Sequence, residues 1–339
     1  MIVWIKQDDG VERRHLGTSG LVVTPIGLGL AGLGRPAYLG AGRADELGAD
    51  RTVEVMERRT HELLDAAYAA GVRYVDAARS YGLAERFLGA WLTYRARPPG
   101  DPAVGSKWGY TYVADWSDWS TGAKVNEVKD HSVDALRRQY AESRAELGDR
   151  LQLYQIHSAT WETGVLDDLA VLDELARMKE LGLAIGLTVS GPGQSDVIRQ
   201  SLEMRMDGVR VFQTVQASWN LLERSAGAAL DEAHQAGYGV IVKEALANGR
   251  LTNLGDRAAG VLTKIANDHA VQVDAVAIAA VLANPWADVV LSGAISADQL
   301  ASNLEAVSVQ LSESETEALT ELTEPPAAYW SQRQAQRWS

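Results

Sequence analysis

Four ionisable side chains stand at or just after the ends of three short apolar segments of the chain. Asp76 and Tyr81 belong to VRYVDAARSYGLAERFLG, Lys107 follows AVGS, and His157 follows LQLYQI. Each has an ordinary explanation by itself: a helix cap for Asp76, packing on Trp91 for Tyr81, a solvated lysine and a core histidine. Neighbouring parallel strands, however, lie about 4.8 Å apart, so strand ends can bring all four groups to one point.

The four side-chain types form a consistent set for proton transfer to a carbonyl oxygen. A phenol with an ordinary pKa near 10 is a weak proton donor at neutral pH. We expect the Lys107 ammonium to lower the pKa of Tyr81, and Asp76 to keep Lys107 charged in a partly buried site. His157 would then orient the carbonyl oxygen and share its hydrogen bond.

The elements that must position these groups alternate along the chain. Short aliphatic or β-branched runs predict eight strands, at residues 22–30, 72–78, 103–107, 151–157, 184–190, 209–216, 238–244 and 288–294. Segments with apolar residues three and four apart, ending in glycine, predict helices between them, as at residues 58–71, 131–148, 168–182 and 225–237.

This alternation predicts an α/β fold, a (β/α)8 TIM barrel. Most of the strands are apolar on both faces, as parallel strands covered by helices are. A doubly wound sheet is the alternative. Since no Pro/Gly/Ser-rich linker divides the sequence, we expect a single domain over residues 1–339, with an N-terminal cap over about 1–20 and a C-terminal tail over about 312–339.

The stretch GLGLAG, residues 27–32, matches the G-x-G-x-x-G spacing of a dinucleotide-binding loop. Such a loop must open a helix. Here Gly34, Pro36, Gly40 and Gly42 follow closely and oppose helix formation. We therefore expect these glycines to end the first barrel strand and to let the chain pass close to a ligand, without cradling a phosphate.

Composition restricts the partners. The formal net charge of −13, with no basic patch, disfavours nucleic acid and anionic membranes. The opening MIVWIKQDDG lacks a secretory signal, which predicts a cytoplasmic location. The apolar stretch AVAIAAVLANPWADVVL is interrupted by Asn284, Pro285 and Asp288, and so predicts helix, turn and strand, without a membrane span.

We expect no metal. The sequence has no cysteine, so thiolate ligands and disulfides are excluded. The histidines show no H-x-H or H-x-x-x-H spacing and stand at His15, His61, His131, His157, His234 and His269. The phosphate loop G-x-x-x-x-G-K-[ST] is also missing from the sequence.

The chain resembles the aldo-keto reductase family. The resemblance is carried, in family order, by VDAARSYGLAERFLG, GSKWG, LYQIH, AIGLTVSG, VQASWNLL, EALANGRL and LSGAISADQLASNL. It implies that Asp76, Tyr81, Lys107 and His157 are the catalytic tetrad, with Tyr81 as general acid. It further implies an NAD(P)(H) cofactor bound across the strand ends, whose nicotinamide C4 supplies hydride to a small carbonyl substrate.

The resemblance also implies which residues contact this cofactor. Thr188 and Gln216 would bond the nicotinamide carboxamide, and Asn303 would reach the adenine. The backbone from Leu246 to Leu251 would cradle the pyrophosphate, and Ser292 to Ser296 would flank the adenosine ribose. The cofactor set is Thr188, Gln216, Lys243, Leu246, Asn248, Gly249, Leu251, Ser292, Gly293, Ile295, Ser296, Gln299 and Asn303.

Three departures from the family pattern affect this cofactor site. Val189 stands where an asparagine is frequent, and Lys243 stands where many members stack a tyrosine on the nicotinamide. Relatives place a cation against the 2′-phosphate of NADP(H), but Gly293, Ile295 and Gln299 occupy those positions here. Because a 2′-phosphate needs charged partners, NAD(H) is favoured, unless Arg250 or Arg257 supplies the charge.

Tryptophans cluster after the predicted strands. Trp108, Trp116, Trp119 and Trp219 are candidates for a substrate pocket at the catalytic face, and packing of the loops is the alternative. With Asp115 and Asp118 available to bond hydroxyl groups, aromatic walls suit a sugar, a sugar-derived compound or an aromatic carbonyl or alcohol. The tail PPAAYWSQRQAQRWS would cover the pocket, meet a second subunit in an oligomer, or fray.

Two other functions fit parts of the pattern. Lys107 at a barrel strand end suits a Schiff-base lyase, which would not need Tyr81. A cofactor-binding redox sensor with little turnover would use the same barrel, although the four candidate catalytic residues oppose that interpretation.

Overall fold

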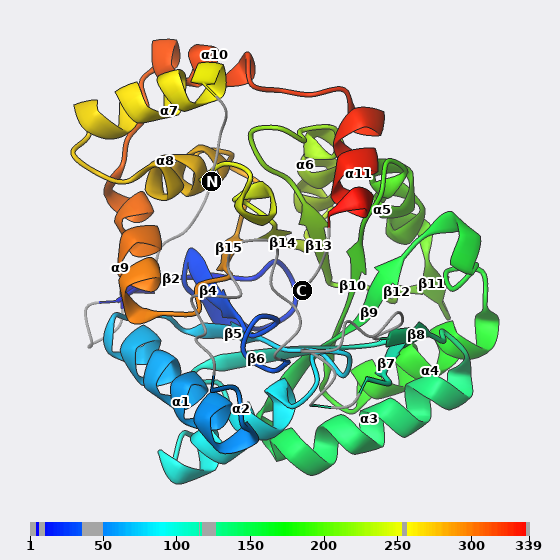
Figure 1. Cartoon of the computed structure of the whole chain (residues 1–339). Coiled ribbons are helices and arrows are strands. Elements are labelled where there is room, and N and C mark those ends of the chain that lie inside the picture. Colours follow the sequence, from blue (N-terminus) through cyan, green and yellow to red (C-terminus); the bar gives the residue numbers. More distant parts are fainter. Residues whose placement is uncertain are drawn as a thin grey trace.

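The computed structural model describes residues 5–6, 11–35, 50–114, 116, 127–252 and 256–336, and it forms a closed barrel of parallel strands surrounded by helices (Figure 1). Each barrel strand pairs with its two neighbours in parallel register. In spatial order the barrel strands are β4 (Ile26–Gly29), β5 (Tyr74–Asp76), β6 (Ala103–Trp108), β9 (Leu151–Ala159), β10 (Ala184–Val189), β13 (Thr214–Ser218), β14 (Gly239–Lys243) and β15 (Val289–Ser292).

Helices connect these strands and cover the outside of the barrel. In chain order they are α1 (Val53–Ala69), α2 (Ala84–Tyr94), α3 (Val133–Leu147), α4 (Leu169–Glu180), α5 (Gln194–Glu203), α6 (Gly227–Gln235), α7 (Asp256–Asp268), α8 (Val273–Leu282) and α9 (Ala297–Glu305). The predicted (β/α)8 fold is therefore confirmed, and the doubly wound alternative is wrong. Each of the eight predicted strand segments overlaps a barrel strand.

Local sequence explains where several helices begin. Thr52, Ser132, Asp168 and Ser296 each precede a helix, and each side-chain oxygen accepts a hydrogen bond from a backbone N–H of the first turn. These caps place the helix starts after the strand ends. Because all the barrel strands are parallel, their carboxyl ends, where the candidate catalytic groups stand, share one face of the barrel.

The amino end of the barrel is closed by apolar side chains. The short antiparallel strands β1 (Ile5–Lys6), β2 (Glu12–His15) and β3 (Val22–Val23) form a small sheet there. Leu16 and Val23 of this segment are fully buried with residues of the barrel strands, including Leu153 and Ile241. The N-terminal segment thus covers the end opposite the strand ends that carry the candidate site.

Some predicted boundaries are wrong. The segment 209–216 is divided between β12 (Val209–Arg210), which pairs with β11 (Arg205–Met206), and the barrel strand that starts at Thr214. β9 continues past His157 to Ala159, because Leu187 and Val189 of β10 still pair with it across a register shift. The hairpin of β7 (Tyr110–Tyr112) and β8 (Glu127–Lys129) was not predicted.

The C-terminal tail is helical and docked. α10 (Glu313–Thr320) and α11 (Pro326–Ala335) follow the last barrel helix, and Tyr329 and Trp330 of α11 are buried against Leu222 and Leu251. The Asn220 side chain donates to Tyr329 Oη at 3.0 Å, and Arg333 forms an ion pair with Glu244. From α10 to α11 the tail therefore packs on the loops that follow β13 and β14, and its covering of a substrate pocket stays a prediction.

The glycines of GLGLAG end β4 and continue into a turn. At Gly34 an added Cβ would lie 2.2 Å from the Tyr81 carbonyl oxygen and 2.4 Å from Ala84 Cβ. The turn thus packs directly on the chain around Tyr81, a close approach that only glycine allows. Residues 36–49, which include Pro36, Gly40 and Gly42, lie outside the described residues.

Within the described ranges, no single helix is long and apolar enough to cross a membrane. Residues Gly260–Asp268 and α8 satisfy the length and composition criterion only together, and they bend by 87° at the break between them. The apolar stretch that contains α8 forms helix, turn and strand, as predicted.

Candidate active site

Lys107 joins two of the other predicted catalytic residues. Its Nζ donates to Asp76 Oδ2 in a buried ion pair and to Tyr81 Oη at 3.2 Å, and it also donates to the Ala77 carbonyl oxygen at 2.9 Å. Asp76 and Lys107 are each 1% exposed. With three acceptors around one buried nitrogen, the side chain is held as an ammonium, which donates all three of its N–H bonds.

The turn that carries Tyr81 is fixed to the neighbouring strand by its backbone. Ala77 N donates to the Gly105 carbonyl oxygen at 2.9 Å, and Arg79 N donates to the Lys107 carbonyl oxygen at 3.0 Å. Since β6 carries both Gly105 and Lys107, the phenol is positioned relative to the strand that carries its ammonium partner.

His157 completes the cluster from β9. Its ring meets the Tyr81 ring edge-on, with centroids 5.6 Å apart, and lies 5.0 Å from the Tyr110 ring. Its Nδ1 lies 3.3 Å from Ser80 Oγ. Burial, followed by the charge of Lys107, lowers the pKa of His157 well below its ordinary value, so the imidazole is neutral near pH 7.

The pKa of Tyr81 differs from the prediction. It is raised above the ordinary value of a phenol, first by burial and then by the negative charge of Asp76, and the Arg35 guanidinium acts in the opposite direction. The expected lowering by Lys107 is therefore wrong for this structure, because burial penalises the phenolate and Lys107 is already paired with Asp76. Tyr81 is a protonated phenol at neutral pH, which is the form that can donate a proton.

The separate structural roles weighed for Asp76 and Tyr81 do not describe this geometry. Leu83 precedes α2 without a side-chain cap, so Asp76 does not cap that helix. Trp91 donates from its indole nitrogen to Asp65 at 2.9 Å, and its ring lies against Tyr68. The four predicted catalytic residues instead lie together at the carboxyl ends of three adjacent strands.

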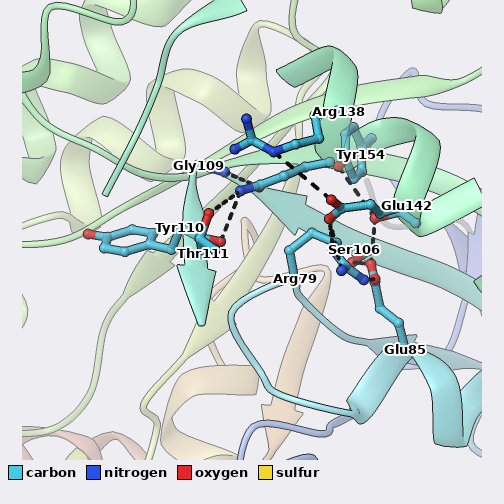
Figure 2. Close-up of polar contacts among 11 residues, drawn as sticks. Arg79, Glu85, Ser106, Gly109, Tyr110, Thr111, Arg138, Glu142 and Tyr154 are labelled. Carbon is cyan, nitrogen blue, oxygen red and sulfur yellow. Dashed lines mark hydrogen bonds and ion pairs between the residues drawn. The ribbon is translucent and has the colours of Figure 1, made fainter. Parts of the chain in front are cut away.

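A buried carboxylate bonded to Ser106, the residue before Lys107, was missed in the sequence. Figure 2 shows Glu85 of α2, which forms an ion pair with Arg79 and accepts from Ser106 Oγ at 2.5 Å. Ser143 of α3 donates to the same oxygen at 2.7 Å. Glu85 is 1% exposed, and its place on the buried face of α2, seven residues before Leu92, is the signal that could have found it.

Arg35 was also missed. It is 3% exposed, its Nη1 lies 3.0 Å from a carboxylate oxygen of Glu127, and its guanidinium carbon is 5.3 Å from the centre of the Tyr81 ring. It follows the close-packed Gly34, so the turn after the first barrel strand delivers a cation to the candidate catalytic phenol. The one sequence signal for this role is the position of Arg35 six residues after the end of β4, close to the carboxyl end of the strand.

The predicted nicotinamide contacts are already engaged with the protein. Thr188 Oγ1 accepts from Ser158 N at 2.8 Å, and Gln216 Nε2 donates to Asp76 Oδ1 at 3.1 Å. Lys243 Nζ donates to Ser218 Oγ at 3.0 Å. Burial lowers the pKa of Lys243 to about 8, although the Glu244 carboxylate partly opposes this.

The predicted adenosine contacts are used in local structure. Ser292 Oγ donates to Asn303 Oδ1 at 2.7 Å, and Asn303 Nδ2 donates to Asp274 at 2.6 Å. Ser296 caps α9 by accepting from Gln299 N, while the Gln299 side chain accepts from Ile295 N at 3.0 Å. Gly293 differs, since an added Cβ there would meet nothing within 4 Å.

The loop after β14 fits an anionic group best. Ala247, Asn248 and Gly249 have φ values of 48°, 56° and 87°, and successive left-handed residues of this kind form concave turns. Asn248 Nδ2 is buried and has no hydrogen-bond partner in the described part of the chain. Leu246 is half-buried and Leu251 is buried beside this loop. An unpaired amide donor suits a phosphate oxygen.

The predicted substrate-pocket tryptophans are mainly packed. Trp108 is fully buried edge-on against His131, and Trp219 is 5% exposed against Trp286. Trp116 contacts Phe87 and donates to the Arg51 carbonyl oxygen at 2.6 Å. Loop packing thus describes the contacts of these three residues. Asp115, Asp118, Trp119 and Arg257 lie outside the residues whose side chains are described.

A cavity of about 250 Å³ adjoins the cluster on the side of α3. Tyr110, Tyr112 and Trp116 line it together with Leu83 and Glu142. None of the four predicted catalytic residues lines this cavity. Among the described residues, no group of three or more His, Asp or Glu side chains is placed to hold a metal ion.

Comparison with known proteins agrees with the barrel and with the order of its segments. Residues 25–324 match the profile of the Aldo/keto reductase family. The chain belongs to this family. It is therefore an oxidoreductase of a type that acts on carbonyl and alcohol groups of small molecules and generally uses nicotinamide cofactors.

Individual aldo-keto reductases and their relatives are distant in sequence. The chain is 25% identical over 288 residues to aldo-keto reductase ausK of Emericella nidulans, covering 76% of this chain and 70% of that protein. It is 27% identical over 164 residues to pyridoxal 4-dehydrogenase of Microbacterium luteolum, which is 43% of each chain. An aldo-keto reductase structure from Bacillus halodurans has a TM-score of 0.68 at 22% identity, covering 92% and 96% of the chains.

Proposed function

We propose that this aldo-keto reductase is an NAD(P)(H)-dependent oxidoreductase in which Tyr81 transfers the proton to or from the substrate oxygen. The observation that carries the proposal is the position of Lys107 Nζ, which bonds both Asp76 and Tyr81 Oη in a buried site. A bound nicotinamide would supply or accept the hydride at its C4 atom. The side chains of this protein would handle the proton and the negative charge that develops on oxygen.

In reduction, Tyr81 Oη gives its proton to the carbonyl oxygen, and the resulting phenolate lies 3.2 Å from the Lys107 ammonium. That ammonium stabilises the phenolate in a site from which water is largely excluded. His157 is neutral, because its pKa is lowered, so it can donate one hydrogen bond to the substrate oxygen without competing for the proton. In oxidation the same steps run in reverse.

The residues after β14 fit the cofactor pyrophosphate, because Asn248 offers a buried amide donor that lacks a partner among the described residues. Gln216 would use its remaining amide oxygen towards the carboxamide, since its Nε2 donates to Asp76. Asn303 would have to exchange its bond to Ser292 or Asp274 to reach the adenine.

NAD(H) is the favoured cofactor. The first turn of α9 contains Asp298 and no cation, so a 2′-phosphate there would meet a carboxylate. Arg250, which could have supplied charge, donates from Nη1 to Glu324 at 3.1 Å as part of an ion pair. Comparison of kcat/KM for NADH and NADPH tests this preference, and a strong preference for NADPH would contradict it.

The proposed substrate is a small carbonyl or alcohol compound, either sugar-derived or aromatic. Tyr110, whose ring contacts His157, provides an aromatic face directly beside the candidate catalytic cluster. The relative pyridoxal 4-dehydrogenase is named for an aromatic aldehyde, which supports including this class in the proposal. A panel of aryl aldehydes, aldoses and the corresponding alcohols, assayed by nicotinamide absorbance, would identify the preferred class.

The lyase alternative is disfavoured by the three acceptors around Lys107 Nζ. A Schiff base requires a neutral amine with a lone pair directed at a carbonyl. Here Asp76, Ala77 and Tyr81 receive the three N–H bonds of an ammonium. Failure of borohydride to trap a substrate adduct on Lys107, together with oxidation of NADH, would separate the two mechanisms.

Tyr81→Phe tests the proposal against the redox-sensor alternative. Loss of the general acid should lower kcat about 100- to 10,000-fold while cofactor affinity stays within about twofold. Tyr238→Phe is the matched control, because its buried hydroxyl donates to the Ser201 carbonyl oxygen at the other end of the barrel. Unchanged turnover in Tyr81→Phe would refute the proposed role.

A further inference from the structure

The carboxylate of Asp76 accepts hydrogen bonds from buried side chains inside the barrel as well as from Lys107. Its Oδ1 accepts from Tyr74 Oη at 3.2 Å, from Gln155 Nε2 at 3.3 Å and from Gln216 Nε2 at 3.1 Å. The other oxygen, Oδ2, accepts from Lys107 Nζ. One oxygen therefore collects three neutral donors, while the other is presented to the ammonium.

These donors come from separate strands inside the barrel. Tyr74 precedes Asp76 by two residues on β5, Gln155 precedes His157 by two residues on β9, and both side chains are fully buried. Alternate residues of a strand point to the same face. The polar layer thus lies one step below the candidate catalytic layer and has no access to solvent.

Three barrel strands carry a glycine next to the side chains of this polar layer. An added Cβ at Gly105 would lie 2.4 Å from Tyr74 Oη, and at Gly27 it would lie 2.7 Å from Tyr74 Cδ1. At Gly186 it would lie 2.1 Å from Thr214 Oγ1 and 3.1 Å from Gln155 Cγ, so this glycine makes room for both side chains. Bulky branched residues usually fill such barrel layers. Here glycines make room for a phenol and an amide that reach Asp76.

We propose that Tyr74 and Gln155 are positioning residues, which hold the Asp76 carboxylate in one orientation so that Lys107 remains directed at Tyr81. The inference rests on the proposed function of the Asp76, Tyr81, Lys107 and His157 cluster. A buried carboxylate oxygen needs hydrogen-bond donors, and the donors it finds fix the direction in which the carboxylate points.

Charged and titratable groups also act on Asp76 from the neighbouring strands. Lys107 on β6 is the cation bonded to Asp76, and Lys243 on β14 acts on it over a longer distance. On the same side Tyr81 shares the Lys107 ammonium with Asp76. Burial, followed by the charge of Asp76, raises the pKa of Tyr74 well above that of an ordinary phenol, so Tyr74 is a neutral donor at any working pH.

The test uses Tyr74→Phe, Gln155→Met and the double variant, with Tyr238→Phe as the control for loss of a buried hydroxyl. We expect each single variant to lower kcat about tenfold while KM stays within about twofold, because a misdirected Lys107 affects the transition state and leaves substrate binding unchanged. Cofactor Kd, measured by quenching of tryptophan fluorescence, should stay within about twofold in every variant.

A fall in kcat accompanied by an equal rise in KM would overturn the inference, since a general structural defect predicts that result. Unchanged kcat in both single variants would overturn it as well. If the wild-type protein oxidises or reduces nothing in the substrate panel, the proposed function fails, and the hydrogen bonds to Asp76 are then tested by urea unfolding. The inference then requires that Tyr74→Phe cost less stability in an Asp76→Asn background than in the wild type, and an equal cost in both backgrounds refutes it.

Discussion

The two ends of the barrel are built from the same strands but have opposite chemistry. The apolar cluster that closes the amino end, which includes Leu16, Val23, Leu153 and Ile241, is called the plug here. Along β9, Leu153 belongs to the plug, Gln155 to the polar layer that bonds Asp76, and His157 to the candidate catalytic layer. β6 repeats this order with Ala103, Gly105 and Lys107. In each strand four residues, or about 13 Å, separate a side chain packed in the apolar plug from one in the candidate catalytic layer.

We infer from this difference that the barrel separates the residues that stabilise it from those proposed to carry its chemistry. The plug buries aliphatic side chains without polar partners, so its contribution comes from the hydrophobic effect and close packing. The opposite end holds an ion pair and a neutral imidazole in a similarly buried environment. Substitutions at the plug should therefore change stability alone, whereas those at the opposite end should change both stability and activity.

Lys107→Met should give the largest effect of all. It removes the cation from a buried carboxylate, which should cost about 3 to 5 kcal/mol of unfolding free energy. The same change should lower kcat about 100- to 10,000-fold, since Tyr81 loses its ammonium partner. Urea unfolding and steady-state kinetics measure the two quantities.

The double variant Asp76→Asn with Lys107→Met provides the control for this prediction. It removes both charges and should recover much of the lost stability without recovering activity. Recovery of activity in the double variant would show that the ion pair is structural only, and that the two ends of the barrel differ less than we infer.

Leu153→Ala should have the next largest effect on stability and almost none on chemistry. Deleting most of a fully buried leucine from the plug should cost about 2 to 5 kcal/mol, through lost burial and the cavity left behind. At temperatures where the variant stays folded, kcat should remain within about twofold of the wild-type value. A large fall in kcat with preserved secondary structure would contradict the division between the two ends.

The strands were predictable because hydrophobic patterns depend on neighbouring residues in the sequence. Ala184 to Val189 is apolar enough to be recognised as a buried strand without knowledge of its partners. The alignment of Asp76, Lys107 and His157 was predictable for a similar reason, because parallel strand ends meet at one face. The pKa of Tyr81 was not, since it depends on how deeply the ring is buried and on which group Lys107 prefers.

Contacts between distant segments were the least predictable part of the site. Arg35 and Glu127 are paired across 92 positions, and Arg333 reaches Glu244 across 89. Neither pair has a local spacing that distinguishes it from solvated surface charge. The hydrogen bonds of Asn303 were equally unpredictable. Only the packed structure shows that its amide oxygen accepts from Ser292 and that its amide nitrogen donates to Asp274.

Acid should destabilise the catalytic end through its buried imidazoles. Burial, followed by the charge of Lys129, lowers the pKa of His131 from 6.5 to about 4. Between these values the unfolded chain binds a proton that the folded chain does not, so stability is intact above about pH 6.5 and falls towards pH 4. His131 alone should account for about 3 kcal/mol of this loss.

His131→Gln isolates that contribution. The amide can still reach the His157 carbonyl oxygen, which His131 Nε2 contacts at 2.9 Å, but it does not titrate. The stability difference between wild type and variant, followed by urea unfolding from pH 7.5 to pH 4.5, should move in favour of the variant as the pH falls. Parallel pH profiles for the two proteins would mean that His131 is not held neutral by burial.

Arg333→Met should give the smallest measurable effect, and it tests how the tail is attached to the catalytic end. The Arg333–Glu244 pair is partly shielded, with side-chain exposures of 22% and 11%, so its loss should cost about 1 kcal/mol near neutral pH. Burial opposes ionisation of Glu244, but Lys243 and Arg333 outweigh it and lower the pKa of Glu244 to about 2. Stability from a carboxylate shifted in this direction is present above about pH 4.5 and is lost towards pH 2, so the effect of the substitution should shrink over that range.

Arg199→Met is the matched surface control, because the Arg199–Glu232 pair has exposures of 45% and 47%. Its removal should change the unfolding free energy by less than about 0.5 kcal/mol, since water and salt screen an exposed pair. Equal costs for the two substitutions would mean that α11 stays in place only through its buried aromatic residues, Tyr329 and Trp330. A larger cost for Arg333→Met, decreasing with acid, would instead show that charge also fastens the tail over the loop proposed to bind the pyrophosphate.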